Sequence, residues 1–131
     1  MSRPPRPESI LPGQVWWCDG VALGFEAHFK RRPALVLRVR RGEHRGEDGD
    51  TLLVAPLSSK RRFGQEQAVT HAGGVSYLTG RAAEVPVNAL LSPLGAWDGF
   101  TEWQATQQQA AEAAAQAANW FARLRRWLTG L

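Results

Sequence analysis

The sequence contains little of the chemistry on which disulfide-stabilised and metal-dependent proteins rely. Among its 131 residues there is one cysteine, Cys18, so no disulfide can form within the chain. The three histidines, His28, His44 and His71, show no metal-ligand spacing. We therefore expect neither a disulfide framework nor a bound metal or other cofactor, and we expect Cys18 to be a packed strand residue.

Long apolar runs are also missing. No segment approaches the roughly 20 apolar residues that a membrane-spanning helix needs. The proline-rich, polar start of the chain, residues 1–10, is unlike a signal peptide and predicts a flexible arm. From these features we expect a cytoplasmic protein with no membrane partner.

Acidic residues are outnumbered by basic ones. The chain has 16 Lys and Arg against 12 Asp and Glu, which gives a formal net charge of +4. Most of the excess is concentrated in the segments 30–32, 38–45 and 60–62. Clustered cations attract a polyphosphate backbone or an acidic protein segment, although any one cluster is also compatible with a plain solvated face.

Short apolar segments separated by glycine and proline dominate residues 11–100. They predict strands at 14–19, 33–40 and 51–57, with weaker signals at 67–70, 75–79 and 81–87. Trp16 and Trp17 are adjacent and should point to opposite faces of the first strand. Because no helical segment separates these strands, the pattern predicts a small β-barrel rather than an α/β sheet.

The remainder of the chain, residues 101–131, has a different character. It is rich in alanine and glutamine and predicts one long helix, with Thr101 as the N-cap and Gly130 as the stop. Apolar residues recur at steps of three, four and seven, at Trp103, Ala110, Ala113, Ala117, Trp120, Leu124 and Trp127. We expect this stripe to pack on the barrel or on a second subunit rather than on a membrane surface. The expected fold class is mainly β with helices (α+β).

Three short motifs follow one another in the first half of the chain. A Pro-Gly turn precedes the first strand at 12–16, an Arg-Pro pair opens the second at Arg32 and Pro33, and Val-Ala-Pro-Leu-Ser closes the third at 54–58. In this order and spacing, over about residues 11–65, they resemble the MazF/PemK family of toxin endoribonucleases. The resemblance implies an SH3-like barrel of the MazF/CcdB type. The segment before Arg32 and the later strand at 81–86 depart from the family pattern.

The resemblance implies metal-independent cleavage of single-stranded RNA by attack of the 2′-hydroxyl, which leaves 2′,3′-cyclic phosphate and 5′-hydroxyl ends. It implies that Arg32 and Ser58 contact the scissile phosphate and that His28 is a candidate acid or base. An arginine fork suits phosphate because it donates two hydrogen bonds and never loses its charge. Ser59 is a reserve donor, since one serine of the pair can instead cap the loop.

Residues beside this pair are candidates for binding RNA. A basic run follows the serines directly, and another basic residue and an aromatic one precede Arg32. Cations would follow the phosphate backbone, while a phenylalanine would stack on a base. The candidates are Lys30, Ser59, Lys60, Arg61 and Arg62, with Phe29 or Phe63 for stacking. The resemblance further implies a homodimer and a cognate antitoxin protein that covers the basic groove.

Three other functions remain open. The chain could be a CcdB-like toxin that acts on DNA gyrase, or a non-catalytic SH3-like module that binds nucleic acid or protein. It could also be a degenerate family member that keeps only antitoxin binding. The Arg-Pro and Pro-Leu-Ser motifs favour the nuclease, because the other functions do not need that pair.

Overall fold

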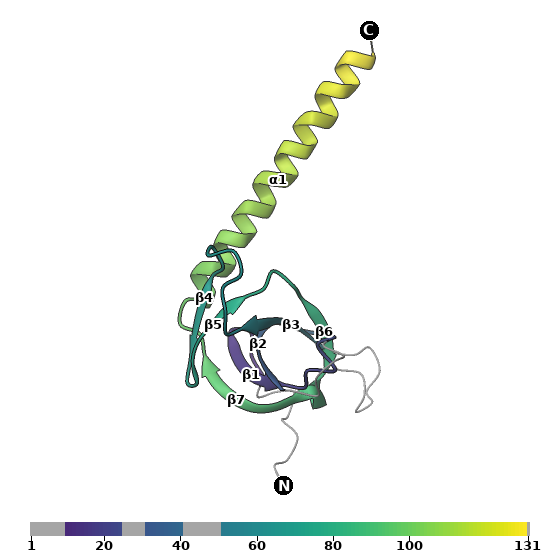
Figure 1. Ribbon diagram of the computed structural model, residues 1–131. Coiled ribbons are helices and arrows are strands. Elements are labelled where there is room, and N and C mark those ends of the chain that lie inside the picture. Colours follow the sequence, from purple (N-terminus) through teal and green to yellow (C-terminus); the bar gives the residue numbers. More distant parts are fainter. Residues whose placement is uncertain (1–9, 25–30, 41–50, 131) are drawn as a thin grey trace. The chain divides into compact units, whose positions relative to one another are not determined.

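The computed structural model describes residues 10–24, 31–40 and 51–130 (Figure 1). Residues 1–9 of the predicted arm, the segment 41–50 between two predicted strands, and the candidate residues His28, Phe29 and Lys30 lie outside the described residues. The chain divides into two compact units, residues 1–98 and 99–131.

The first unit is a sheet of seven strands. The strands are β1 Gln14–Cys18, β2 Arg32–Arg40, β3 Thr51–Ser58, β4 Ala68–His71, β5 Gly74–Leu78, β6 Ala83–Pro86 and β7 Leu90–Ala96, with a 3-10 turn at Val87–Ala89 before β7. The first six agree with the predicted strands to within two residues at either end. The seventh was not predicted, because Pro93 and Gly95 interrupt its apolar run and weaken the strand signal.

Antiparallel pairing joins the strands in the order β4-β5-β3-β2-β1-β7, with β6 paired to β3. One edge of β3 pairs with β2, while β3 also pairs with β6 near its start and with β5 near its end. The backbone N–H of Ala72, just after β4, donates to the carbonyl of Leu94 on β7 at 2.9 Å. The two ends of the strand order therefore meet, and the sheet curls into the half-barrel seen in Figure 1. This confirms a mainly β fold with a helix.

The inside of the curl is filled by alternate side chains of the central strands. Trp16 lies opposite Ala34 and is 8% exposed, whereas the next pair, Trp17 and Pro33, is only half-buried. The two tryptophans thus take opposite faces, as predicted. The buried cluster consists of Ile10, Trp16, Cys18, Leu23, Ala34, Val36, Leu52, Val54, Val85, Ala89 and Leu90. Its first member, Ile10, shows that the packed core begins one residue before the predicted barrel.

The second unit is the single helix α1, Phe100–Thr129. The predicted stop is confirmed, since the N–H of Gly130 donates to the carbonyl of Arg126 at 2.9 Å. The predicted N-cap Thr101 is wrong. Gly99 occupies that position without a side-chain hydrogen bond, so the helix begins one residue earlier and includes Phe100, whose ring lies 6.1 Å from that of Trp103. No helix among the described residues has the length and apolarity needed to cross a membrane.

Candidate nucleic-acid interface

The start of β2 and the end of β3 lie at the same end of the sheet because the two strands are antiparallel. Their pairing extends to Ala34 opposite Pro56, and two residues further in the same register are Arg32 and Ser58. Strand alternation gives these two residues the face of Ala34 and Pro56. Both are half-buried. The Arg-Pro and Pro-Leu-Ser motifs, separated in sequence, therefore lie beside each other where the pairing of β2 with β3 ends.

β5 also pairs with this end of β3, and it carries Tyr77. Tyr77 lies opposite Ser58 and is half-buried. The guanidinium carbon of Arg61 is 4.6 Å from the centroid of the Tyr77 ring, within the range of a cation–π contact. We call Arg32, Ser58, Tyr77 and Arg61 the basic row. Sequence reasoning missed Tyr77, because a pairing between strands far apart in sequence leaves no local signal.

Ser58 also shapes the loop that follows it. Its hydroxyl oxygen accepts the backbone N–H of Lys60 at 3.2 Å. Of the two serines, Ser58 is therefore the one that caps the loop, while Ser59 is exposed. A hydroxyl that accepts one hydrogen bond still has its own proton to donate. The cap consequently leaves Ser58 able to donate to a phosphate oxygen.

Residues 59–67 join β3 to β4, and we call them the basic loop. The Glu66 side chain holds this loop by binding backbone N–H groups. One carboxylate oxygen, Oε1, accepts the N–H of Phe63 at 2.7 Å and that of Arg62 at 3.1 Å. These hydrogen bonds, the one from Phe63 foremost, lower the pKa of Glu66. The Phe63 ring is 86% exposed. Within the part of the chain that the structure describes, the side chains of Lys60 and Arg62 form no ion pair, so their charge faces solvent.

The arginine pair that opens β2 is divided between the two faces. Arg31 lies with its guanidinium carbon 5.2 Å from the ring of Trp17, which pairs with Pro33. Arg32 pairs instead with Cys18, on the face of the buried cluster. Of the two arginines, only Arg32 therefore belongs to the basic row.

Cys18 is a core residue rather than a nucleophile. Burial, reinforced by the neighbouring charge of Asp19, raises the pKa of its thiol to about 11. At neutral pH the thiol is therefore protonated and unreactive. This agrees with its expected place in a packed strand.

His71 is a structural residue of the β4–β5 hairpin. Its Nδ1 accepts the N–H of Gly73 at 3.1 Å, so Nε2 carries the proton and donates to the buried Ser76 hydroxyl at 2.9 Å. Burial lowers the pKa of the imidazole, which favours this neutral form. Both ring nitrogens are thus occupied by the hairpin itself.

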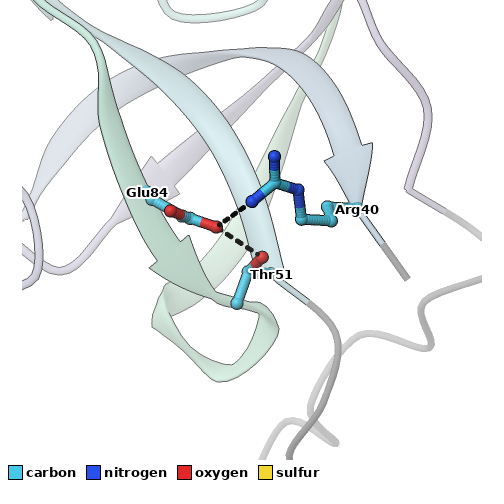
Figure 2. A network of polar contacts seen from close by, with 3 residues as sticks. All are labelled: Arg40, Thr51 and Glu84. Carbon is cyan, nitrogen blue, oxygen red and sulfur yellow. Dashed lines mark hydrogen bonds and ion pairs between the residues drawn. The ribbon is translucent and has the colours of Figure 1, made fainter. Parts of the chain in front are cut away.

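The opposite end of β2 and β3 carries a different arrangement (Figure 2). Oε1 of Glu84 on β6 accepts a hydrogen bond from the Thr51 hydroxyl at 2.9 Å and lies 3.5 Å from a guanidinium nitrogen of Arg40. This contact ties three strands together and neutralises the cation. No group of three His, Cys, Asp or Glu residues within the described ranges could hold a metal ion.

Comparison with known proteins identifies no family for this chain. No protein-family model matches the chain. No curated protein matches it either.

Proposed function

We propose that this chain is a metal-independent endoribonuclease with an SH3-like barrel of the MazF/PemK toxin type, and that it cuts single-stranded RNA. One observation supports the proposal: the pairing of Ala34 with Pro56 brings together the motifs that contain Arg32 and Ser58, next to a solvent-facing basic loop. The Arg-Pro and Pro-Leu-Ser motifs that suggested the function are thus neighbours in space as well as in order.

Cleavage by this route needs groups that bind the phosphate, here Arg32 and Ser58, and a group that carries protons. The ribose 2′-oxygen attacks the adjacent phosphorus as its proton leaves, and the bond from phosphorus to the 5′-oxygen breaks as that oxygen gains a proton. The phosphorane between these steps carries extra negative charge. Arg32 would donate two hydrogen bonds to its oxygens, and Ser58 would donate a third. The candidate acid or base, His28, lies outside the described residues.

The rest of the interface would hold the strand. Lys60 and Arg62 offer exposed charge for phosphates beside the reacting one. Tyr77, backed by Arg61, and the exposed ring of Phe63 offer flat surfaces for bases. A cognate antitoxin with an acidic or apolar tail would inhibit by covering the same surface.

A second candidate is a non-catalytic module that binds nucleic acid. The observation in its favour is the hydrogen bond from the N–H of Lys60 to the Ser58 hydroxyl, which gives that serine a structural use without catalysis. This candidate keeps RNA binding through the basic loop and predicts no turnover.

The deciding experiment is incubation of the purified chain with a mixed-sequence single-stranded RNA in EDTA. Arg32→Ala is tested beside Arg40→Ala, a matched arginine at the other end of the same strand. Cleavage that survives EDTA, persists in Arg40→Ala and is lost in Arg32→Ala supports the nuclease. RNA that is bound but stays intact across several sequences supports the binding module.

A further inference from the structure

The apolar residues of α1 follow a coiled-coil repeat. Ala110, Ala113, Ala117, Trp120, Leu124 and Trp127 are separated by alternating steps of three and four. A hydrophobic repeat of 3.5 residues is typical of helices that wind around another helix of matching pattern. It predicts a helical partner rather than a flat surface.

This stripe is open to solvent. From Gln104 to Thr129 every residue of the helix is exposed, and Trp120 and Trp127 are 58% and 66% exposed. Phe121 and Leu128, also exposed, widen the stripe on one side. A contiguous patch of large apolar side chains on a soluble domain marks an interaction surface.

Side-chain sizes along the stripe match a second copy of the same helix running antiparallel. In one register Ala110 meets Trp127, Ala113 meets Leu124 and Ala117 meets Trp120, and the two-fold symmetry repeats each contact. Every layer then pairs a small side chain with a large one, which fills a core evenly. A parallel pair would instead stack alanine on alanine at one end and tryptophan on tryptophan at the other, so the two ends would need different helix separations.

The flanking residues agree with this partner. Arg123 is the only charged residue at a position bordering the stripe, and the antiparallel register sets it beside Gln116 of the other copy. The charged residues Glu112, Arg125 and Arg126 fall on the outer face. The pairing therefore brings no like charges together along its edges.

We propose that α1 is a homodimerisation helix that pairs antiparallel with α1 of a second copy through residues 110–127. The proposal is independent of ribonuclease activity, since it rests on the helix alone. It gives the exposed aromatic end of the helix a partner that the chain itself supplies.

The first test compares two neighbouring alanines in the full chain by sedimentation equilibrium. Ala117→Glu puts a carboxylate inside the proposed core, while Ala118→Glu puts the same group on the outer face, at an equal cost in helix propensity. We expect wild type and Ala118→Glu to sediment at twice the 14.5 kDa chain mass. Ala117→Glu should raise the dimer dissociation constant at least about 100-fold. Circular dichroism checks that both variants keep their helix.

A wild type that stays monomeric, including one that binds anionic vesicles as a monomer, would overturn the proposal. So would a dimer that Ala117→Glu leaves unchanged, because the barrel would then supply the interface.

Direction is tested by cross-linking. In the antiparallel pair, a mixture of Ala113→Cys and Leu124→Cys proteins forms a disulfide between the two variants, and Ala110→Cys alone forms none. The buried Cys18 is common to all samples, so the wild type is the control. Disulfides in Ala110→Cys alone would contradict the antiparallel arrangement, because only a parallel pair brings that residue to its own copy.

Discussion

Basic side chains lie at both ends of the β2–β3 pair, but the neighbouring carboxylate side chain makes different contacts at each end. At one end Arg40 lies against Glu84, which also accepts a hydrogen bond from Thr51. At the other end the acidic residue of the loop, Glu66, accepts backbone N–H groups. Glu66 thus shapes the basic loop, whereas Glu84 neutralises a basic side chain.

We therefore interpret Arg40 as a structural residue and the basic row with its loop as the candidate functional surface. A cation paired with a carboxylate contributes little field to a passing phosphate, whereas solvent-facing cations beside an aromatic ring attract and hold a polyanion. Changes at the basic row should therefore alter activity and RNA binding. Changes at the Arg40 end alter only stability.

The largest effect is expected for Arg32. Arg32→Ala should lower the rate of RNA cleavage at least about 100-fold, because it removes the donors proposed to bind the negatively charged phosphorane. Arg32→Lys should recover little, since an ammonium group cannot form the bidentate contact. Single-turnover cleavage assays measure both, with Arg40→Ala as the control. Equal losses in Arg32→Ala and Arg40→Ala would remove the distinction between the two ends.

A smaller loss is expected for Ser58. Ser58→Ala removes both the loop cap and the proposed donor to the phosphate, and should slow cleavage about tenfold to 100-fold. Ser58→Thr keeps the hydroxyl and should restore most of the rate. Ser59→Ala is the matched control, because that neighbouring serine is exposed. Full activity in Ser58→Ala would show that the hydroxyl has no part in the reaction.

Tyr77 should affect binding more than chemistry. Tyr77→Ala should weaken the affinity for single-stranded RNA about tenfold, in line with the roughly 1–3 kcal/mol of one base stack. Tyr77→Phe keeps the ring and should bind like the wild type. Fluorescence anisotropy with a labelled RNA measures both. An unchanged affinity in Tyr77→Ala would exclude the ring from the interface.

Acid should loosen the basic loop before it unfolds the barrel. The folded-state pKa of Glu66 is lowered from its ordinary value of 4.5, so its stabilising hydrogen bonds are fully present above that value. They are lost as the pH falls through the lowered pKa. Hydrogen exchange at the amide of Phe63, corrected for its intrinsic pH dependence, should show falling protection in this range. Protection in Glu66→Ala should already be low at neutral pH, and unchanged protection in that variant would contradict the assignment.

The smallest effect is expected at the Arg40 end. Glu84→Gln removes an ion pair between side chains that are 67% and 53% exposed, so the free energy of unfolding should fall by only about 0.2–1 kcal/mol. Cleavage should stay at the wild-type rate. Urea unfolding measures the change in stability, and the cleavage assay measures the rate. A large loss of activity in Glu84→Gln would indicate that the functional site lies at the Arg40 end of the strands, which contradicts the proposal.

Six strands could be predicted from the sequence, three of them from clear apolar runs such as residues 51–57 and three from weaker signals between glycines. Sequence reasoning missed β7, where Pro93 and Gly95 break the apolar run. It also misplaced the helix start, since a glycine can occupy the N-cap in place of the expected Thr101.

Some residues of the candidate site could be predicted from the sequence and others could not. Arg32 and Ser58 could be named from motifs, whereas Tyr77 could not, because its pairing with Ser58 depends on how β3 leaves β2 and meets β5. The stripe on α1 was visible in the sequence, but its exposure was not.

In the proposed reaction, the ribose 2′-hydroxyl of the RNA itself attacks the phosphate. The most direct measurement maps one cleaved bond and then replaces the nucleotide on its 5′ side with its 2′-deoxy form in an otherwise identical RNA, assayed in EDTA. The proposed mechanism predicts that this bond stays intact while the RNA still binds. Cleavage of the deoxy-substituted bond at the wild-type rate would contradict it.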